Sequence, residues 1–202
     1  KLANMTPASE YSRKAALYLI EIHSNRKDEA KVSFYLQKLK GTKEYNTAMT
    51  MIGDLYVTKG NYEKALDYYN QSNDKNNPKL IYGEAYSLYK NGKYEEALKK
   101  FESLKNSDYY NQSIYHIFAI NYKLKNFDEI IRNREIIRKV VVSQVDTDNI
   151  IRIIANSAYQ VGNYKLAKDY YGRLFAVSPD KENLFRVILL DSQMLDMEDL
   201  RI

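Results

Sequence analysis

Two histidines are the residues of this sequence best suited to proton transfer or metal binding. His23 and His116 lie far apart in the chain, and neither has a second histidine at the spacing of metal ligands. Acid-base catalysis and metal binding both need further groups held close by. We therefore expect no catalytic residue, no metal site and no cofactor, and interpret both histidines as surface or groove-edge residues.

Cysteine chemistry is also missing. With no cysteine in 202 residues, the chain has no thiol nucleophile, disulfide or thiolate ligand. The segment 146–149, Asp-Thr-Asp-Asn, resembles the start of a calcium loop, but no glycine follows at the sixth position and no glutamate at the twelfth. We interpret it as a helix N-cap. These observations predict a protein that is not an enzyme.

The charge distribution does not favour a nucleic-acid partner. Lys and Arg number 31 against 26 Asp and Glu, and the net charge of +5 is spread along the chain, whereas nucleic-acid binders usually have a clustered basic face. In the one local basic cluster, acidic residues alternate with basic ones at helical spacing, which favours a salt-bridged surface. Its members are Arg132, Arg134, Arg138 and Lys139, with Asp128, Glu129 and Glu135 among them.

Membrane and targeting signals are not found. No apolar run approaches the roughly 18 residues that a membrane-spanning helix needs, so no membrane insertion is expected. The chain begins at Lys1 without a basic-then-apolar leader, which indicates a processed product or a fragment of a longer protein. The sequence therefore does not indicate a cellular location. The abundance of Lys, Asn, Tyr and Ile favours a bacterial source.

A motif that recurs along the chain indicates how the side chains are positioned. Gly-x-Tyr-x-x-Ala occurs at 60–65, 92–97 and 162–167, and a weaker copy, Lys-Asn-Phe-Asp-Glu-Ile, occurs at 125–130. The aromatic residues of the four copies are 32, 33 and 37 residues apart. Seven glycines and three prolines leave few tight turns for a sheet protein. Helices are therefore the simpler interpretation. The spacing resembles that of helical repeats with a period of about 34 residues, each a pair of antiparallel helices and a turn, and this resemblance implies an insertion near 142–148 before the last copy.

Simple packing arguments explain the motif. Gly60, Gly92 and Gly162 are expected to end the first helix of each pair, where a left-handed backbone conformation suits a residue without Cβ. The alanine that ends each motif is expected where the two helices are closest, because little more than a methyl group fits there. These alanines are Ala65, Ala97 and Ala167.

Further residues match a known repeat family. Ile52-Gly53 followed by Tyr56 is similar to the Leu-Gly-x-x-Tyr of the tetratricopeptide repeat, whose period is about 34 residues. From about residue 11 to 190 the chain resembles this family. The resemblance implies an all-α fold, a right-handed superhelical solenoid of antiparallel helix pairs. Other matching residues are Ala85 and Ala155 at small positions, Tyr69, Phe101 and Tyr171 at the large aromatic position, and Pro78 and Pro179 at the repeat junctions.

We expect a single array over residues 1–202. Two parts depart from the family pattern: the Arg26-Lys27 turn has no glycine, and Arg134 stands at an aromatic position in a unit that also has Phe118 and Ile130 at small positions. The second departure predicts an unusual helix angle. The units are 11–41, 46–78, 78–109, 111–144 and 148–179, with a partial repeat or capping helix at 180–202. The expected helices are 11–24, 27–39, 45–59, 62–72, 78–91, 94–105, 109–124, 127–142, 148–161, 164–177 and 181–194, the last with Leu184, Val187 and Ile188 on one face.

The resemblance implies where a partner binds. In this family the first helices of the pairs line a concave groove that holds extended or helical peptides. Tyrosine is frequent at these positions and suits an interface, since it combines a large apolar face with a hydroxyl. The alternative for Tyr89, Tyr122 and Tyr159, which share one repeat position, is a structural role. The groove candidates are Asp54, Lys79, Tyr82, Tyr86, Tyr89, Tyr115, Tyr122, Arg152, Asn156 and Tyr159.

The predicted function is a scaffold or adaptor segment that binds a peptide or a folded protein through this groove. Family members that grip chaperone tails use a clamp of Lys, Asn and Arg, and that clamp is absent here, so chaperone tails are not expected. Two alternatives remain: a structural spacer or self-assembly module, and the regulatory arm of a larger multidomain protein. The positions that match the clamp hold Ala15, Leu19, Met51 and Gly83.

Overall fold

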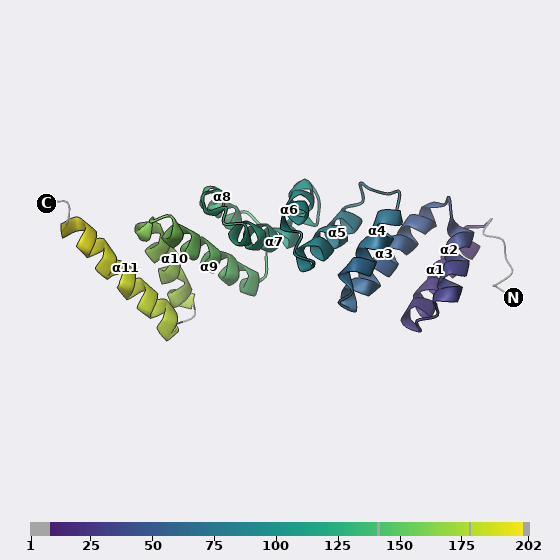
Figure 1. Ribbon diagram of the computed structural model, residues 1–202, viewed down its shortest axis with the longest axis horizontal. Helices are drawn as coiled ribbons and strands as arrows, with labels where there is room; N and C mark the ends of the chain where they lie inside the picture. Colours follow the sequence, from purple (N-terminus) through teal and green to yellow (C-terminus); the bar gives the residue numbers. More distant parts are fainter. Residues whose placement is uncertain (1–8, 141, 178, 200–202) are drawn as a thin grey trace. The chain divides into compact units, whose positions relative to one another are not determined.

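The structure is a computed structural model that describes residues 9–140, 142–177 and 179–199 (Figure 1). It is 79% helical, and its described residues form helices that pack in adjacent pairs, with no strand among them. The chain divides into two compact units, one ending at Ser107 and the next beginning at Asp108. The expected all-α fold of helix pairs is confirmed.

The first unit holds three helix pairs. In each pair we call the earlier helix the first helix and the later one the second. The pairs are α1 (Glu10–Asn25) with α2 (Glu29–Leu39), α3 (Lys43–Thr58) with α4 (Tyr62–Gln71), and α5 (Pro78–Lys90) with α6 (Tyr94–Ser103).

The second unit holds two pairs and one further helix. The described elements are α7 (Tyr110–Lys123) with α8 (Phe127–Arg132) and the 3₁₀ helix η2 (Arg134–Arg138), then α9 (Gln144–Gln160) with α10 (Tyr164–Val177), and finally α11 (Lys181–Asp199). α11 packs against α10 and stands where another pair would begin.

The turn inside every pair has the same backbone geometry. Gly60, Gly92 and Gly162 have φ of 72°, 76° and 74°, as expected from the motif. At the two turns without glycine, Lys27 and Lys125 take the same left-handed conformation, each with φ of 59°. Lysine is strained there, because its Cβ approaches the backbone carbonyl. The turn is thus set by the repeat even where the sequence does not favour it.

The interior of each pair contains the expected small and large residues. Ala65, Ala97 and Ala167 are fully buried, which lets the two helices approach closely. The large aromatic residues of the second helices, Tyr69 and Phe101 in the first unit and Tyr171 in the second, are also buried, with 0%, 0% and 1% of their surface exposed. The expected small residues and the expected large aromatic residues of the repeat are therefore both confirmed as buried.

Tyr69 is held between two glycines of neighbouring first helices. A Cβ added at Gly53 of α3 would lie 2.7 Å from Tyr69 Cδ1, and one added at Gly83 of α5 would lie 2.5 Å from the Tyr69 hydroxyl oxygen. Both distances are too short for real contacts, so these positions admit no larger residue while the ring stays in place. Tyr69 therefore joins two consecutive pairs of the first unit.

The expected helix at 127–142 is wrong in its length. α8 stops at Arg132, and η2 follows from Arg134. In other second helices a buried aromatic ring anchors the helix at this position, but here Arg134 keeps a partly exposed guanidinium that donates a 2.8 Å hydrogen bond to the Ile131 carbonyl. A charged group is costly to bury, so the long helix is lost after two turns.

The insertion lies earlier than expected. α9 begins at Gln144, four residues before the expected start at 148, and Ser143 is its N-cap, with the Ser143 hydroxyl accepting from the Asp146 N–H at 3.1 Å. Asp146 was expected to cap the helix, but it lies in the first turn, where a carboxylate favourably meets the helix dipole.

α11 packs differently from the expected apolar face. Val187 lies against the core of the second unit, whereas Leu184 and Ile188 are 41% and 58% exposed. The helix also runs to Asp199, five residues beyond the expected end at 194.

Candidate functional site

The first helices of the first unit form a hollow where the groove is expected. It has a volume of about 190 Å³ and lies between α1 and α3. Its floor includes Met51, Ile52 and Leu55, and polar groups surround it. Of the groove candidates, Asp54 lines it directly. The polar lining residues are Glu21, Ser24, Asn25 and Thr58.

Asp54 connects three helices at this face. Its Oδ1 accepts a hydrogen bond from the Tyr69 hydroxyl of α4 at 2.7 Å, and its Oδ2 lies 2.8 Å from Lys79 Nζ of α5. Burial and the nearby Asp54 charge both raise the pKa of Tyr69 well above its usual range. Two groove candidates, Asp54 and Lys79, are thus brought into contact, and the carboxylate has a fixed direction.

Two tyrosines lie on α5, the helix that also carries Lys79. Tyr82 meets the ring of Phe101 edge-on, with centroids 5.7 Å apart, and is partly exposed. Tyr86 meets Tyr62 edge-on at 6.1 Å, and Lys90 Nζ lies 5.4 Å from its ring centroid. Each ring has one side packed on the unit and keeps accessible surface, as expected for a contact residue on a rigid element.

The three tyrosines that share one repeat position each contact one ring of their own helix pair, and Tyr159 is also 37% exposed. Each tilts against the aromatic residue that starts the second helix, with centroid separations of 5.6 to 6.0 Å. The ring pairs are Tyr89 with Tyr94, Tyr122 with Phe127, and Tyr159 with Tyr164.

In the second unit the polar groove candidates are tied to α11. Asn156 Oδ1 accepts from the hydroxyl of Tyr171, which in turn accepts from Arg186 of α11 at 3.1 Å. Arg152 donates to Asn183 Oδ1 at 3.2 Å, and Asn183 is fully buried. Burial raises the pKa of Tyr171.

Sequence reasoning missed two members of this polar network, Asn183 and Arg186. Their positions in the repeat could have identified them, because both residues lie on α11, the helix that follows the last complete pair. They stand on the next first helix, as Lys79 does relative to Asp54 in the first unit. Tyr115, the remaining candidate, packs partly against the core of the second unit and tilts against His116 at 5.4 Å.

The expectation that both histidines lie at the surface is wrong for His23. It is 8% exposed, stacks on Tyr35 with centroids 6.0 Å apart, and has its Nδ1 3.4 Å from Asp28 Oδ2. The turn after α1 folds Asp28 back over the helix end, which covers the imidazole. His116 is half-buried.

Three of the four basic residues in the cluster around η2 form ion pairs. Arg138 lies 3.0 Å from Glu135, Arg134 lies 3.6 Å from the same residue, and Arg132 pairs with Glu129. Across the residues that the structure describes, no group of three or more acidic or histidine side chains could hold a metal ion. No helix in the described ranges has the length and apolar character needed to cross a membrane.

Known proteins with this fold include several helical repeat structures. One is a tetratricopeptide repeat protein from Parabacteroides merdae, at TM-score 0.65 and 16% identity, covering 90% of this chain and 73% of that one. Another is the pilF protein of Pseudomonas aeruginosa, at TM-score 0.57 and 18% identity, covering 92% of this chain and 86% of that one. No curated protein sequence matches the chain.

A family model identifies one repeat directly. The model described as tetratricopeptide repeat matches residues 47–74, which span most of α3 and all of α4. This is the helix pair that contains Gly53, Ala65 and Tyr69. The resemblance read from the sequence is confirmed: the chain carries a tetratricopeptide repeat at residues 47–74 and has the fold of tetratricopeptide repeat proteins.

Proposed function

We propose that this chain is a scaffold or adaptor segment that holds a peptide or a folded protein against its first helices. Tetratricopeptide repeats generally mediate protein-protein interaction. The observation that carries the proposal is the hollow of about 190 Å³ between α1 and α3, with Asp54 fixed at its edge by Tyr69 and Lys79. An apolar floor with oriented polar groups around it is the arrangement that recognises a partner.

The tyrosines of α5 support the same face. A tyrosine loses little side-chain entropy on binding and contributes a large contact area. Tyr82 and Tyr86 are already held by Phe101 and Tyr62, so ordering them for a partner costs little further. We rank these two above Tyr89, Tyr122 and Tyr159, whose rings pack at the turns of their own pairs.

Site-specific photocrosslinking tests the face. A photoreactive residue at Thr58 or Asn25, two exposed positions that line the hollow, is expected to give a discrete protein adduct in cells that encode this chain. The matched controls are Lys99 and Glu95, exposed positions on the second helix α6. Equal adducts from all four positions, or adducts from α6 alone, would contradict binding at the first helices.

The same adduct can then be tested by substitution. Tyr86→Ala is expected to weaken it strongly, whereas Lys99→Ala, a change at an exposed position of the second helix α6, is expected to leave it unchanged. Circular dichroism is the check that both variants remain helical. An adduct that survives Tyr86→Ala at full yield counts against the proposed role of α5.

We also propose that the repeats over residues 1–202 act as one array. The recurrence of the motif on both sides of Ser107 supports this, because stacked repeats unfold cooperatively when each buries its neighbour. Urea denaturation followed by circular dichroism should then give one transition. Two resolved transitions would instead make the two compact units independent domains.

Self-assembly is a second candidate, and it rests on the exposed apolar side chains of α11. Phe185 and Ile188 are 63% and 58% exposed, which is unusual for large apolar residues on one helix. Sedimentation across a range of concentrations measures association, and Phe185→Ser with Ile188→Ser should abolish it. A monomer at high concentration removes this candidate.

A further inference from the structure

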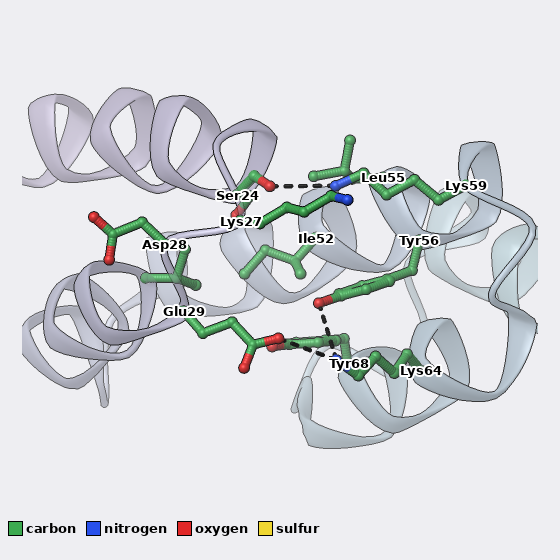
Figure 2. A pocket seen from close by; sticks show the side chains of 11 residues that line it. Ser24, Lys27, Asp28, Glu29, Ile52, Leu55, Tyr56, Lys59, Lys64 and Tyr68 are labelled. Carbon is green, nitrogen blue, oxygen red and sulfur yellow. Dashed lines mark hydrogen bonds and ion pairs between the residues drawn. The ribbon is translucent and has the colours of Figure 1, made fainter.

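A second, smaller cavity opens at the turn edge of the first unit. It has a volume of about 160 Å³ and lies between the turn after α1 and the turn between α3 and α4 (Figure 2). Val32 and Ile52 line its floor and are 5% and 2% exposed. Leu55 adds a third apolar wall. The cavity therefore has an apolar base that water solvates poorly.

Two stacked tyrosines form one side of this cavity. The rings of Tyr56 and Tyr68 are nearly parallel, with an interplanar angle of 13° and centroids 5.4 Å apart. Lys64 Nζ lies 3.5 Å from the Tyr56 hydroxyl and 3.1 Å from Glu29 Oε1. Figure 2 shows these groups converging on the cavity from α2, α3 and α4. The groups of this wall thus contact one another from three helices.

The carboxylates at the cavity are already engaged. Glu29 pairs with Lys64 at 3.1 Å. Asp28 accepts from the Lys31 N–H at 3.2 Å and lies within 3.5 Å of both Lys31 Nζ and His23 Nδ1. Neither carboxylate forms an ion pair with the other two lysines of the cavity, Lys27 and Lys59.

Two lysines at the cavity have no carboxylate partner among the residues that the structure describes. Lys59 Nζ donates to the Ser24 carbonyl at 3.2 Å and lies 5.7 Å from the Tyr56 ring centroid. Lys27, in its left-handed turn, also lines the cavity. Figure 2 shows both side chains extending along the Ser24 side. The result is a local surplus of positive charge beside an apolar pocket.

We propose that this cavity binds one apolar side chain of an acidic peptide segment, whose carboxylates contact Lys27 and Lys59. The cavity volume of about 160 Å³ limits the size of the side chain that can enter. Small-molecule sites usually measure about 300 to 1,000 Å³, while an apolar cavity of about 150 Å³ holds a group the size of benzene. A leucine side chain fits this range. Because Lys27 and Lys59 add positive charge at the cavity, we expect the peptide residues that flank the leucine to be acidic.

The cavity adjoins the hollow of the proposed groove. The two share Ser24, Ile52 and Leu55 as lining residues. The two lysines lie outside the groove hollow. The inference therefore does not rest on the proposed function, and variants distinguish the two sites.

Three synthetic peptides test the chemistry on the full chain labelled with nitrogen-15. The acidic probe is acetyl-Asp-Asp-Leu-Asp-Asp-amide, and its controls replace either the four Asp by Asn or the Leu by Ser. The acidic probe is expected to shift the amide signals of the turn at 24–29 and of residues 55–64. Both controls are expected to bind about tenfold more weakly or worse, since one carries no charge and the other no apolar anchor.

Variants then locate the site. Lys59→Gln and Lys27→Gly should each weaken the acidic probe by roughly threefold, the value of one partly screened ion pair, and glycine suits the left-handed turn at position 27. Lys99→Gln on α6 is the matched control and should have no effect. Binding that is equal for all three peptides, or that is lost in Tyr86→Ala but kept in both cavity variants, would overturn the proposal.

Discussion

The hydroxyl of Tyr69 donates a hydrogen bond of 2.7 Å to the carboxylate of Asp54, fifteen residues earlier in the chain. The bond connects a fully buried ring to the first-helix face. The second unit repeats the arrangement at the same spacing, where the Tyr171 hydroxyl donates to Asn156. The polar groups of the candidate groove are therefore oriented from the cores of the helix pairs.

Removing the Tyr69 hydroxyl tests this connection. Tyr69→Phe leaves the ring in place and takes one hydrogen bond from Asp54, which keeps its ion pair with Lys79. We expect the free energy of unfolding to fall by about 1 kcal/mol, the usual net value of such a bond. Urea denaturation measures it. Tyr18→Phe, at an exposed ring, is the control. An equal loss of stability in both variants would show that the hydrogen bond from Tyr69 to Asp54 does not stabilise the fold.

Alkaline pH should weaken the fold through the same residue. The folded protein holds the pKa of Tyr69 above its unfolded value of about 10. The stabilisation is thus fully present below that pH and is lost as pH rises from there toward the folded pKa. The pH dependence of the free energy of unfolding, measured between about pH 9 and pH 11, should be shallower in Tyr69→Phe by up to about 1.4 kcal/mol per pH unit. Identical slopes would refute the assignment.

A methyl group at Gly83 should be costly. Its Cβ would lie 2.5 Å from the Tyr69 hydroxyl oxygen, and the ring cannot retreat because Gly53 lies against it as well. We expect Gly83→Ala to destabilise the protein by about 1 to 3 kcal/mol through overpacking. Thermal unfolding of Gly172→Ala provides the contrast. No atom lies within 4 Å of an added Cβ there, so that change should be stabilising.

The turn at Lys125 should accept glycine with a gain in stability. Lys125 has a φ of 59°, a conformation that is strained for every residue with a Cβ. Lys125→Gly is expected to raise the free energy of unfolding by up to about 1 kcal/mol after the larger chain entropy of glycine is subtracted. Lys125→Ala removes the same charge but keeps the Cβ. A matching gain in the alanine variant would attribute the effect to charge instead of backbone strain.

The sequence determined the repeat and much of its interior. Glycine, alanine and aromatic residues recur at fixed spacing, and each type is set by a local requirement: a left-handed turn, a close helix contact, a buried ring. Gly92, Ala97 and Phe101 illustrate this within one pair. Such requirements depend on neighbours along one hairpin, so they leave a readable pattern.

Tertiary structure decided what depends on contacts between pairs. The link from Arg186 to Tyr171 depends on which side chains meet between a pair and the helix that follows it. The burial of His23 and the end of α8 at Arg132 depend on contacts within one pair that the repeat pattern does not specify. The cavity at Lys27 and Lys59 likewise forms only when two turns, some thirty residues apart, are brought together. The spacing of residue types specifies a helix pair, whereas stacking the pairs determines which polar groups become partners.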